Sequence, residues 1–156
     1  MVRVTVENRF DAPPDFVRDW LTDFRPDDGQ RWFEFKAPVQ VTRKGNEFHT
    51  EGPHPVGYAK GVVVIDSPTA WHATNQFSKT RGGPVIGVGQ VRETVRAEGQ
   101  GTLHRAEITF EPKTLGLKVM FGLMGRSMMD KSMTKGFAKI KQEMEAQYKA
   151  GKPPTA

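Results

Sequence analysis

A carboxylate and an imidazole lie close together in a segment whose pattern predicts a hairpin. Gly99-Gln100 has the composition of a two-residue turn between strands at Val85–Glu98 and Thr102–Glu111. This turn places Glu93 diagonally opposite His104, within reach of its side chain. The other residues on the same face are mostly apolar, which indicates that the face points inward: Val91, Val95, Thr102, Ala106, Ile108 and Phe110.

An inward-facing pair of Glu93 and His104 allows two kinds of chemistry. The pair could fix a ligand hydroxyl or carbonyl group inside a cavity, or it could act as a general acid and base. The alternative is a structural hydrogen bond inside the core, or a bulge that turns Glu93 outward. No nucleophile accompanies the pair in a recognisable arrangement, so the sequence favours binding over catalysis.

Other kinds of site find little support in the sequence. The chain has no cysteine, which excludes disulfides and thiolate chemistry. His49 and His54 have no third ligand nearby, although zinc sites use three or four protein ligands. Gly82-Gly83-Pro84 precedes a strand, whereas a phosphate-binding loop needs a following helix. We therefore expect no metal and no cofactor.

The spacing of apolar residues predicts a strand, two short helices, six further strands and a long C-terminal helix. The first strand is expected at Val2–Asn8 and the second helix at Gln30–Phe35, while Gly52-Pro53-His54-Pro55 is expected to break the chain between two strands. Because hairpins link most of the strands, we expect a curved, seven-stranded antiparallel sheet in an α+β domain. This single domain is expected over residues 1–150, with a disordered tail at 151–156.

Leu117–Tyr148 is predicted as one long helix with two different halves. The first half is apolar nearly all round, and it contains Gly122 and Gly125. Glycine weakens a helix interior by about 1 kcal/mol, so the two glycines predict a bend or a close approach. The second half has one apolar stripe that is typical of a core-facing helix: Met133, Phe137, Ile140, Met144 and Tyr148.

The C-terminal part of the chain is strongly basic. Residues 113–156 contain 9 Lys/Arg and 3 Asp/Glu, whereas residues 1–112 contain 14 and 15. A solvated lysine-rich helix face explains this most simply, and attraction of an anionic ligand, a membrane surface or an acidic protein is the alternative. A nucleic-acid partner is not expected, because no Arg/aromatic cluster or recognition motif is present.

We expect a cytoplasmic protein without a transmembrane segment. No apolar run approaches the roughly 20 residues of a membrane span. The N-terminus alternates like a strand and has no apolar signal-peptide core. Membrane contact is therefore expected only as a transient association of the basic C-terminal helix with a membrane surface.

Several segments resemble the START/polyketide-cyclase-like (SRPBCC, helix-grip) superfamily. The resemblance is carried by Ala12–Phe24, Ile65–Pro68, Gly99–Thr102 with Ile108–Pro112, and Gly136–Lys141 with Glu145. It covers nearly the whole chain and implies a helix-grip fold, in which the sheet wraps around the C-terminal helix. It also implies that the front half of that helix lines an apolar cavity, and that aromatic residues of the short helices flank the cavity mouth.

Binding or transport of an apolar or amphipathic small molecule, such as a lipid, a quinone or a polyketide-like compound, is the expected function. The front-half methionines share one face, and their flexible side chains suit either an irregular core or an adaptable pocket wall. Core packing also explains the tryptophans. The expected ligand-binding residues are Phe24, Trp32, Trp71, Glu93, His104, Met120, Met124 and Met128.

Two other classes of function stay open. The first is a polyketide cyclase/dehydratase-type enzyme that uses His104 or Glu93 as acid or base. The second is a protein-interaction module in which the basic helix binds an acidic partner.

Overall fold

Seven strands form one antiparallel sheet in the computed structural model, which describes residues 1–154. Their order across the sheet is β1-β7-β6-β5-β4-β3-β2, so only β1 leaves the sequential order and lies beside β7. The predicted seven-stranded sheet is confirmed. In chain order the strands are β1 (Val2–Phe10), β2 (Gln40–Lys44), β3 (Glu47–His54), β4 (Gly57–Ser67), β5 (Ala70–Ser78), β6 (Val85–Glu98) and β7 (Gly101–Pro112).

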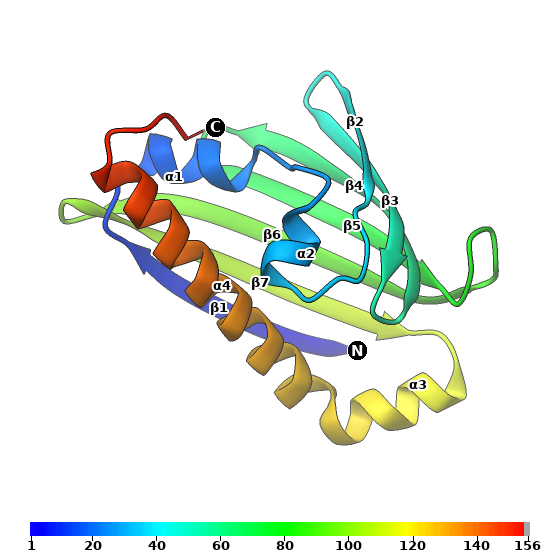
Figure 1. Ribbon diagram of the computed structural model, residues 1–156. Helices are drawn as coiled ribbons and strands as arrows, with labels where there is room; N and C mark the ends of the chain where they lie inside the picture. The colour runs from blue at the N-terminus through cyan, green and yellow to red at the C-terminus, as the bar shows by residue number, and fades with distance from the viewer. Residues whose placement is uncertain (155–156) are drawn as a thin grey trace.

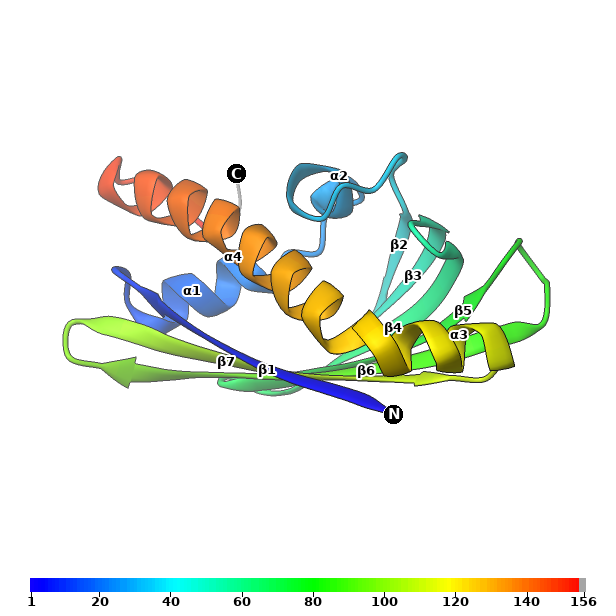
Figure 2. The same cartoon turned by 90° about the horizontal axis from the view of Figure 1, so that it is seen from below.

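Three helices cover one face of this curved sheet: α1 (Pro14–Leu21), α2 (Asp28–Trp32) and α4 (Arg126–Lys149) (Figures 1 and 2). Helix α4 crosses β1, while β2 and β3 curl up beside α2, so the helices lie on the concave side (Figure 2). The largest fully buried side chains come from both layers: Trp20, Trp71, Phe10, Met144, His104, Val17 and Thr102. This is the α+β helix-grip architecture that the sequence predicts.

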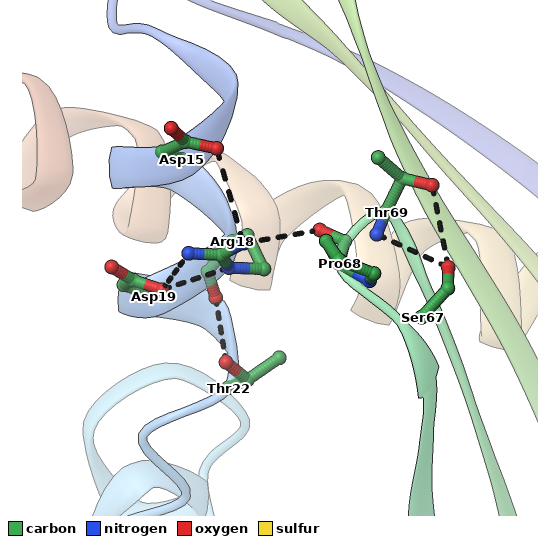
Figure 3. A network of polar contacts seen from close by, with 7 residues as sticks. All are labelled: Asp15, Arg18, Asp19, Thr22, Ser67, Pro68 and Thr69. Carbon is green, nitrogen blue, oxygen red and sulfur yellow. Dashed lines mark hydrogen bonds and ion pairs between the residues drawn. The ribbon is translucent and has the colours of Figure 1, made fainter.

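One arginine ties α1 to the sheet (Figure 3). The Arg18 guanidinium forms an ion pair with Asp19 of the same helix, 2.6 Å between Nη2 and Oδ1. Its Nη1 also donates to the carbonyl oxygen of Pro68, at 3.5 Å, in the turn between β4 and β5. The indole N–H of Trp20, in the same helix, donates to the side-chain oxygen of Gln147 in α4 at 2.7 Å. Helix α1 is thereby fixed between the sheet and α4.

The C-terminal helical segment consists of three connected pieces. Helix α3 (Leu115–Met120) passes into a π-helical turn, η1 (Phe121–Gly125), and α4 follows. A Cβ atom on Gly125 would lie 2.9 Å from the Cβ of Phe121, so this position requires a glycine. The close approach predicted for the two glycines is confirmed at Gly125, at the end of η1, whereas nothing lies within 4 Å of a Cβ on Gly122. Of the apolar stripe predicted for the second half, Phe137, Ile140 and Met144 are buried in the core and Met133 packs against it. Tyr148, the last residue of that stripe, is 42% exposed.

Strand β3 is longer than the sequence predicts. It continues to His54, whereas the prolines around this residue predict a break from Gly52 onward. The neighbouring strand β2 begins at Gln40, opposite Glu51, so Pro53 has no ladder partner on that side. Proline fits an edge of this kind because it lacks only an N–H that nothing there would accept.

The second helix begins and ends earlier than predicted. It spans Asp28–Trp32 instead of Gln30–Phe35. Phe33 closes it, with its N–H bonded to the Gly29 carbonyl oxygen at 3.0 Å, and Glu34 then takes a positive φ of 61° that a helix cannot continue.

After α4 the chain turns back at Gly151, which has a φ of 69°. The N–H of Lys152 donates to the carbonyl oxygen of Gln147 at 3.2 Å. A tail was expected at residues 151–156. Its last two residues, 155–156, lie outside the described residues. Within residues 1–154, no helix combines the length and the apolar character needed to cross a bilayer.

Candidate functional site

A cavity of about 300 Å³ lies between α2, the loop that follows it and strands β2 to β5. Apolar side chains form most of its wall: Phe24, Phe33, Phe35, Val39, Val41, Ala59 and Phe77. Polar side chains also reach it: Arg25, Asp28, Thr50, Glu51, His54 and Asn75. An apolar wall with polar groups at defined points is typical of small-molecule sites, which span about 300–1,000 Å³.

Small residues on the inward face of the sheet leave this space open. Ala59 of β4 pairs with Gly52 of β3 on one side and with Phe77 of β5 on the other. Next along the same face, Gly61 pairs with Asn75, and a Cβ at Gly61 would collide with the Asn75 amide. The floor of the cavity is therefore set by residues that lack bulky side chains.

His54 contributes a neutral imidazole to the wall. Its ring lies 4.9 Å from the ring of Phe35 and 4.8 Å from that of Phe77, between centroids. Burial lowers the pKa of His54 from 6.5 to about 4, so the ring is uncharged at pH 7. The Nδ1 atom accepts the backbone N–H of Val56 at 3.3 Å, which assigns the proton to Nε2. His54 therefore offers the cavity one uncharged N–H donor.

Asp28 and Arg25 form a polar end of the cavity. The Nε of Arg25 pairs with Asp23 at 3.0 Å and lies 3.5 Å from Asp28 Oδ1. Burial raises the pKa of Asp28 to about 6, although the hydrogen bond from the Arg25 backbone N–H opposes the shift. Burial also raises the pKa of Asp23, against the attraction of the Arg25 guanidinium. The Arg25 guanidinium thus lies within ion-pair distance of two partly buried carboxylates, those of Asp23 and Asp28.

The predicted pair of Glu93 and His104 forms as the hairpin register requires. Val95 lies opposite His104 in the β6–β7 ladder, and His104 Nε2 is 2.7 Å from Glu93 Oε2. The Asn8 amide lies 3.2 Å from Nδ1, so an amide N–H donates there while Nε2–H donates to the carboxylate.

This hydrogen bond is enclosed by the core. The His104 side chain is fully buried, and it lies near the rings of Phe137 (5.0 Å) and Trp71 (6.3 Å, stacked). The Glu93 side chain keeps 19% of its surface exposed. Neither residue lines the cavity beneath α2, so ligand contact by this pair stays a prediction.

The predicted aromatic residues separate into one cavity residue and two core residues. Phe24 lies in the cavity wall, with a φ of 41° that turns the chain toward α2. Trp32 and Trp71 are 5% and 2% exposed and belong to the core. Of these three predicted aromatic residues, the structure therefore brings only Phe24 to the cavity.

The predicted methionines lie away from the cavity. Met120 is half-buried, while Met124 and Met128 are 54% and 47% exposed. Met124 lines a separate surface groove, which also contains Val4 and Thr5 of β1. None of the three methionines lines the cavity beneath α2. Their contact with a ligand therefore stays a prediction.

Several wall residues were not among the expected ligand contacts. Val39 and Val41 carried a usable signal, since their alternation places both on one face of a strand. Ala59 could have been found from the β4–β5 register once Phe77 was placed inward. His54 was obscured by its flanking prolines, which predict a break. Among residues 1–154, no group of at least three His, Asp or Glu side chains could hold a metal ion.

Comparison with known proteins finds similarity at the level of the fold. No family model and no curated protein sequence matches the chain. A protein from Thermus thermophilus shares 15% identity and a TM-score of 0.63 over 96% of this chain and 99% of its own. A START superfamily protein from Mycobacterium smegmatis shares 12% identity and a TM-score of 0.65 over 92% and 97%.

A third similar structure is a di-domain protein, of which this chain matches about half. The di-domain ARO/CYC StfQ from the steffimycin biosynthetic pathway shares 14% identity and a TM-score of 0.68. The match covers 96% of this chain and 52% of StfQ. Together with the seven-stranded sheet and the long C-terminal helix, these matches show that the chain has the START-like, polyketide-cyclase-like (SRPBCC) helix-grip fold.

Proposed function

We propose that the protein binds an apolar or amphipathic small molecule in the cavity between α2 and strands β2 to β5. The observation that supports this proposal is the apolar wall, which the neutral imidazole of His54 interrupts. Burial of the ligand's carbon surface would drive binding at about 25 cal/mol per Å². The Nε2–H of His54 would meet a carbonyl or ether oxygen of the ligand.

The size of the cavity narrows the ligand class. A volume of about 300 Å³ is at the small end of the usual range for ligand sites. A compact ligand of one or two rings with an oxygen acceptor fits this volume better than a whole phospholipid. The names of the fold neighbours, which include a START superfamily protein and ARO/CYC proteins, are consistent with a small-molecule role.

Native mass spectrometry of the full chain, purified without detergent, tests the proposal directly. A retained small molecule would give a mass above that of the 17.5 kDa chain and would name its class. Thermal unfolding with a panel of hydroxylated and carbonyl-bearing aromatic compounds provides the second measurement. At about 100 times Kd, a ligand adds about 2.7 kcal/mol and raises Tm by roughly 5–10 °C for a chain of this size.

A pair of variants distinguishes the cavity from unspecific surface binding. Ala59→Leu places a larger side chain in the cavity, and it should weaken binding at least tenfold. Thr74→Leu adds a similar side chain on the exposed, opposite face of the neighbouring strand, and it should bind as the natural protein does. An unliganded protein whose Tm ignores the panel would reject the proposal, and so would equal binding by the two variants.

A cyclase-type enzyme is the second candidate, and the hydrogen bond between Glu93 and His104 favours it. Because His104 is fully buried, Glu93 is the member of the pair that a substrate could reach, and His104 would position it. Turnover of a poly-β-ketone mimic that is lost in Glu93→Gln, with the ligand-induced Tm shift retained, would support catalysis. Turnover that Glu93→Gln leaves unchanged would exclude a catalytic role for this carboxylate.

A further inference from the structure

Helix α3, the π-turn η1 and the first turn of α4 expose an unusual set of large apolar side chains. The exposed fractions are 79% for Leu115, 55% for Val119, 81% for Leu123, 54% for Met124 and 47% for Met128. We call these five residues the apolar face. Scattered apolar residues are normal on protein surfaces, but a contiguous group of this kind marks an interaction site.

The position of α3 explains why these side chains find no core. Helix α4 lies over the sheet, whereas α3 lies at the ends of β6 and β7 (Figures 1 and 2). The segment is anchored by Phe121, whose ring lies 4.4 Å from that of Phe110 in β7. Leu115, Val119 and Leu123 recur at intervals of four residues and follow one side of the segment, which the anchor leaves facing outward.

Positive charge accompanies the apolar face. Arg3, Lys118 and Arg126 line a groove of about 460 Å³ between the start of β1 and η1. In the part of the chain that the structure describes, none of these three cations has a carboxylate within ion-pair distance. Asp130 is the acid that borders the neighbouring groove beside Leu123 and Arg126. Glu111 is also close enough to Lys118 for that charge to help lower its pKa, but its carboxylate pairs with Lys113 at 2.7 Å. Cations therefore outnumber acids around the apolar face.

We propose that this apolar face, with Arg3, Lys118 and Arg126, docks onto an anionic lipid surface. Apolar side chains would enter the boundary between headgroups and acyl chains, while the cations contact lipid phosphates, as in interfacial amphipathic helices. Self-association through the same face would bring six such cations from two copies together, which like-charge repulsion opposes. The surface does not overlap the cavity beneath α2, so it is independent of the ligand-binding proposal.

Co-sedimentation of the full chain with vesicles tests the lipid surface. Vesicles of phosphatidylcholine with phosphatidylglycerol should carry the protein into the pellet, and vesicles of phosphatidylcholine alone should leave it in solution. Raising the salt from about 0.1 M to about 1 M shortens the Debye length from about 10 Å to about 3 Å and should release the protein. Absence of binding to both kinds of vesicle would overturn the proposal.

Variants separate the two contributions to docking. Lys118→Gln with Arg126→Gln should weaken binding about 30-fold, since each cation near an anionic surface contributes about a fivefold factor. Lys60→Gln with Arg92→Gln removes two exposed cations from other strands and should leave binding unchanged. Leu123→Ser should weaken it about tenfold or more. Tyr148→Ser, at a residue 42% exposed near the opposite end of α4, is its matched control.

A fluorescent label reports which face enters the lipid. Because the chain has no cysteine, Met124→Cys and Thr74→Cys, the latter at an exposed residue of β5, can each be labelled uniquely with an environment-sensitive dye. Phosphatidylglycerol vesicles should shift the emission of the label at position 124 to the blue and leave that at position 74 unchanged. Equal shifts would overturn the assigned face. A dimer in solution that Leu123→Ser dissociates, without vesicle binding by the natural protein, would assign the face to self-association instead.

Discussion

The ring of Phe33 lies directly on the backbone of α4 at Gly136. A Cβ atom at Gly136 would lie 2.7 Å from Cδ1 of Phe33 and closer still to Cε1. Two ion pairs secure the same contact, Lys135 with Glu34 and Arg31 with Glu143. The segment that roofs the cavity is therefore held against the C-terminal helix at a position where any larger residue would force the Phe33 ring to shift.

Gly136→Ala should destabilise the protein although alanine is the better helix former. Overpacking against Phe33 costs about 1–3 kcal/mol, and the helix propensity of alanine returns about 1 kcal/mol, so the expected net loss is up to about 2 kcal/mol. Urea unfolding measures it. Because the clash moves the cavity roof, ligands that raise the Tm of the natural protein should raise that of Gly136→Ala less.

The matched control is Gly116→Ala in α3, where nothing lies within 4 Å of the added methyl group. This change should stabilise the protein by a few tenths to about 1 kcal/mol. Phe33→Leu should reduce the cost of Gly136→Ala in a double-mutant cycle, since it removes the ring edge that clashes. A neutral effect of Gly136→Ala would mean that Phe33 moves away freely.

Local signals in the sequence were sufficient for much of the fold. Gly99-Gln100 closes the β6–β7 hairpin, so its register and the contact between Glu93 and His104 follow from turn chemistry and the two-residue period of a strand. The core stripe of α4 likewise follows from the helical period.

The candidate site could be predicted only in part. Phe24 was found, but the position of His54 depends on where the pairing of β3 with β2 stops, at Gln40 and Glu51, and local sequence does not encode this pairing between segments. Met124 and Met128 show a different limit. Their periodicity indicates an apolar surface, yet it cannot distinguish a cavity wall from a face that points away from the protein.

Protonation of His54 should destabilise the folded protein in mild acid. Its pKa is about 4 in the folded chain and 6.5 in a model peptide, so the unfolded chain binds this proton more tightly. The contribution of the neutral ring is complete above pH 6.5 and is lost as pH falls toward 4, by up to about 3 kcal/mol. The free energy of unfolding, measured in urea from pH 7.5 to 4, should be lower for His54→Gln than for the natural protein at pH 7.5. This difference should shrink as the pH falls toward 4. Parallel pH profiles would contradict the assignment.

Asp28 should produce a slope of the opposite sign. Burial raises its pKa from 3.8 to about 6, so the folded chain binds the proton more tightly than the unfolded chain. Stability from this group is present below pH 3.8 and is lost as pH rises through 6, by up to about 3 kcal/mol. Asp28→Asn keeps an oxygen for the Arg25 N–H and removes the charge. It should therefore be more stable than the natural protein at pH 8, with a gain that disappears below about pH 4. Destabilisation at pH 8 would show that the ion pair with Arg25 outweighs burial.

Glu93 should tolerate an amide and not a hydrocarbon. Glutamine can still accept the Nε2–H of buried His104, so Glu93→Gln should change the free energy of unfolding by less than about 1 kcal/mol. Glu93→Leu leaves that N–H without a partner and should cost about 1–3 kcal/mol. Glu107→Leu is the control on the same hairpin, because the Glu107 carboxylate pairs with Arg105 at the surface, where ion pairs contribute little. If Glu93→Leu and Glu107→Leu lower the free energy of unfolding equally, the hydrogen bond between Glu93 and His104 adds nothing to stability. Its role would then have to lie in binding or catalysis.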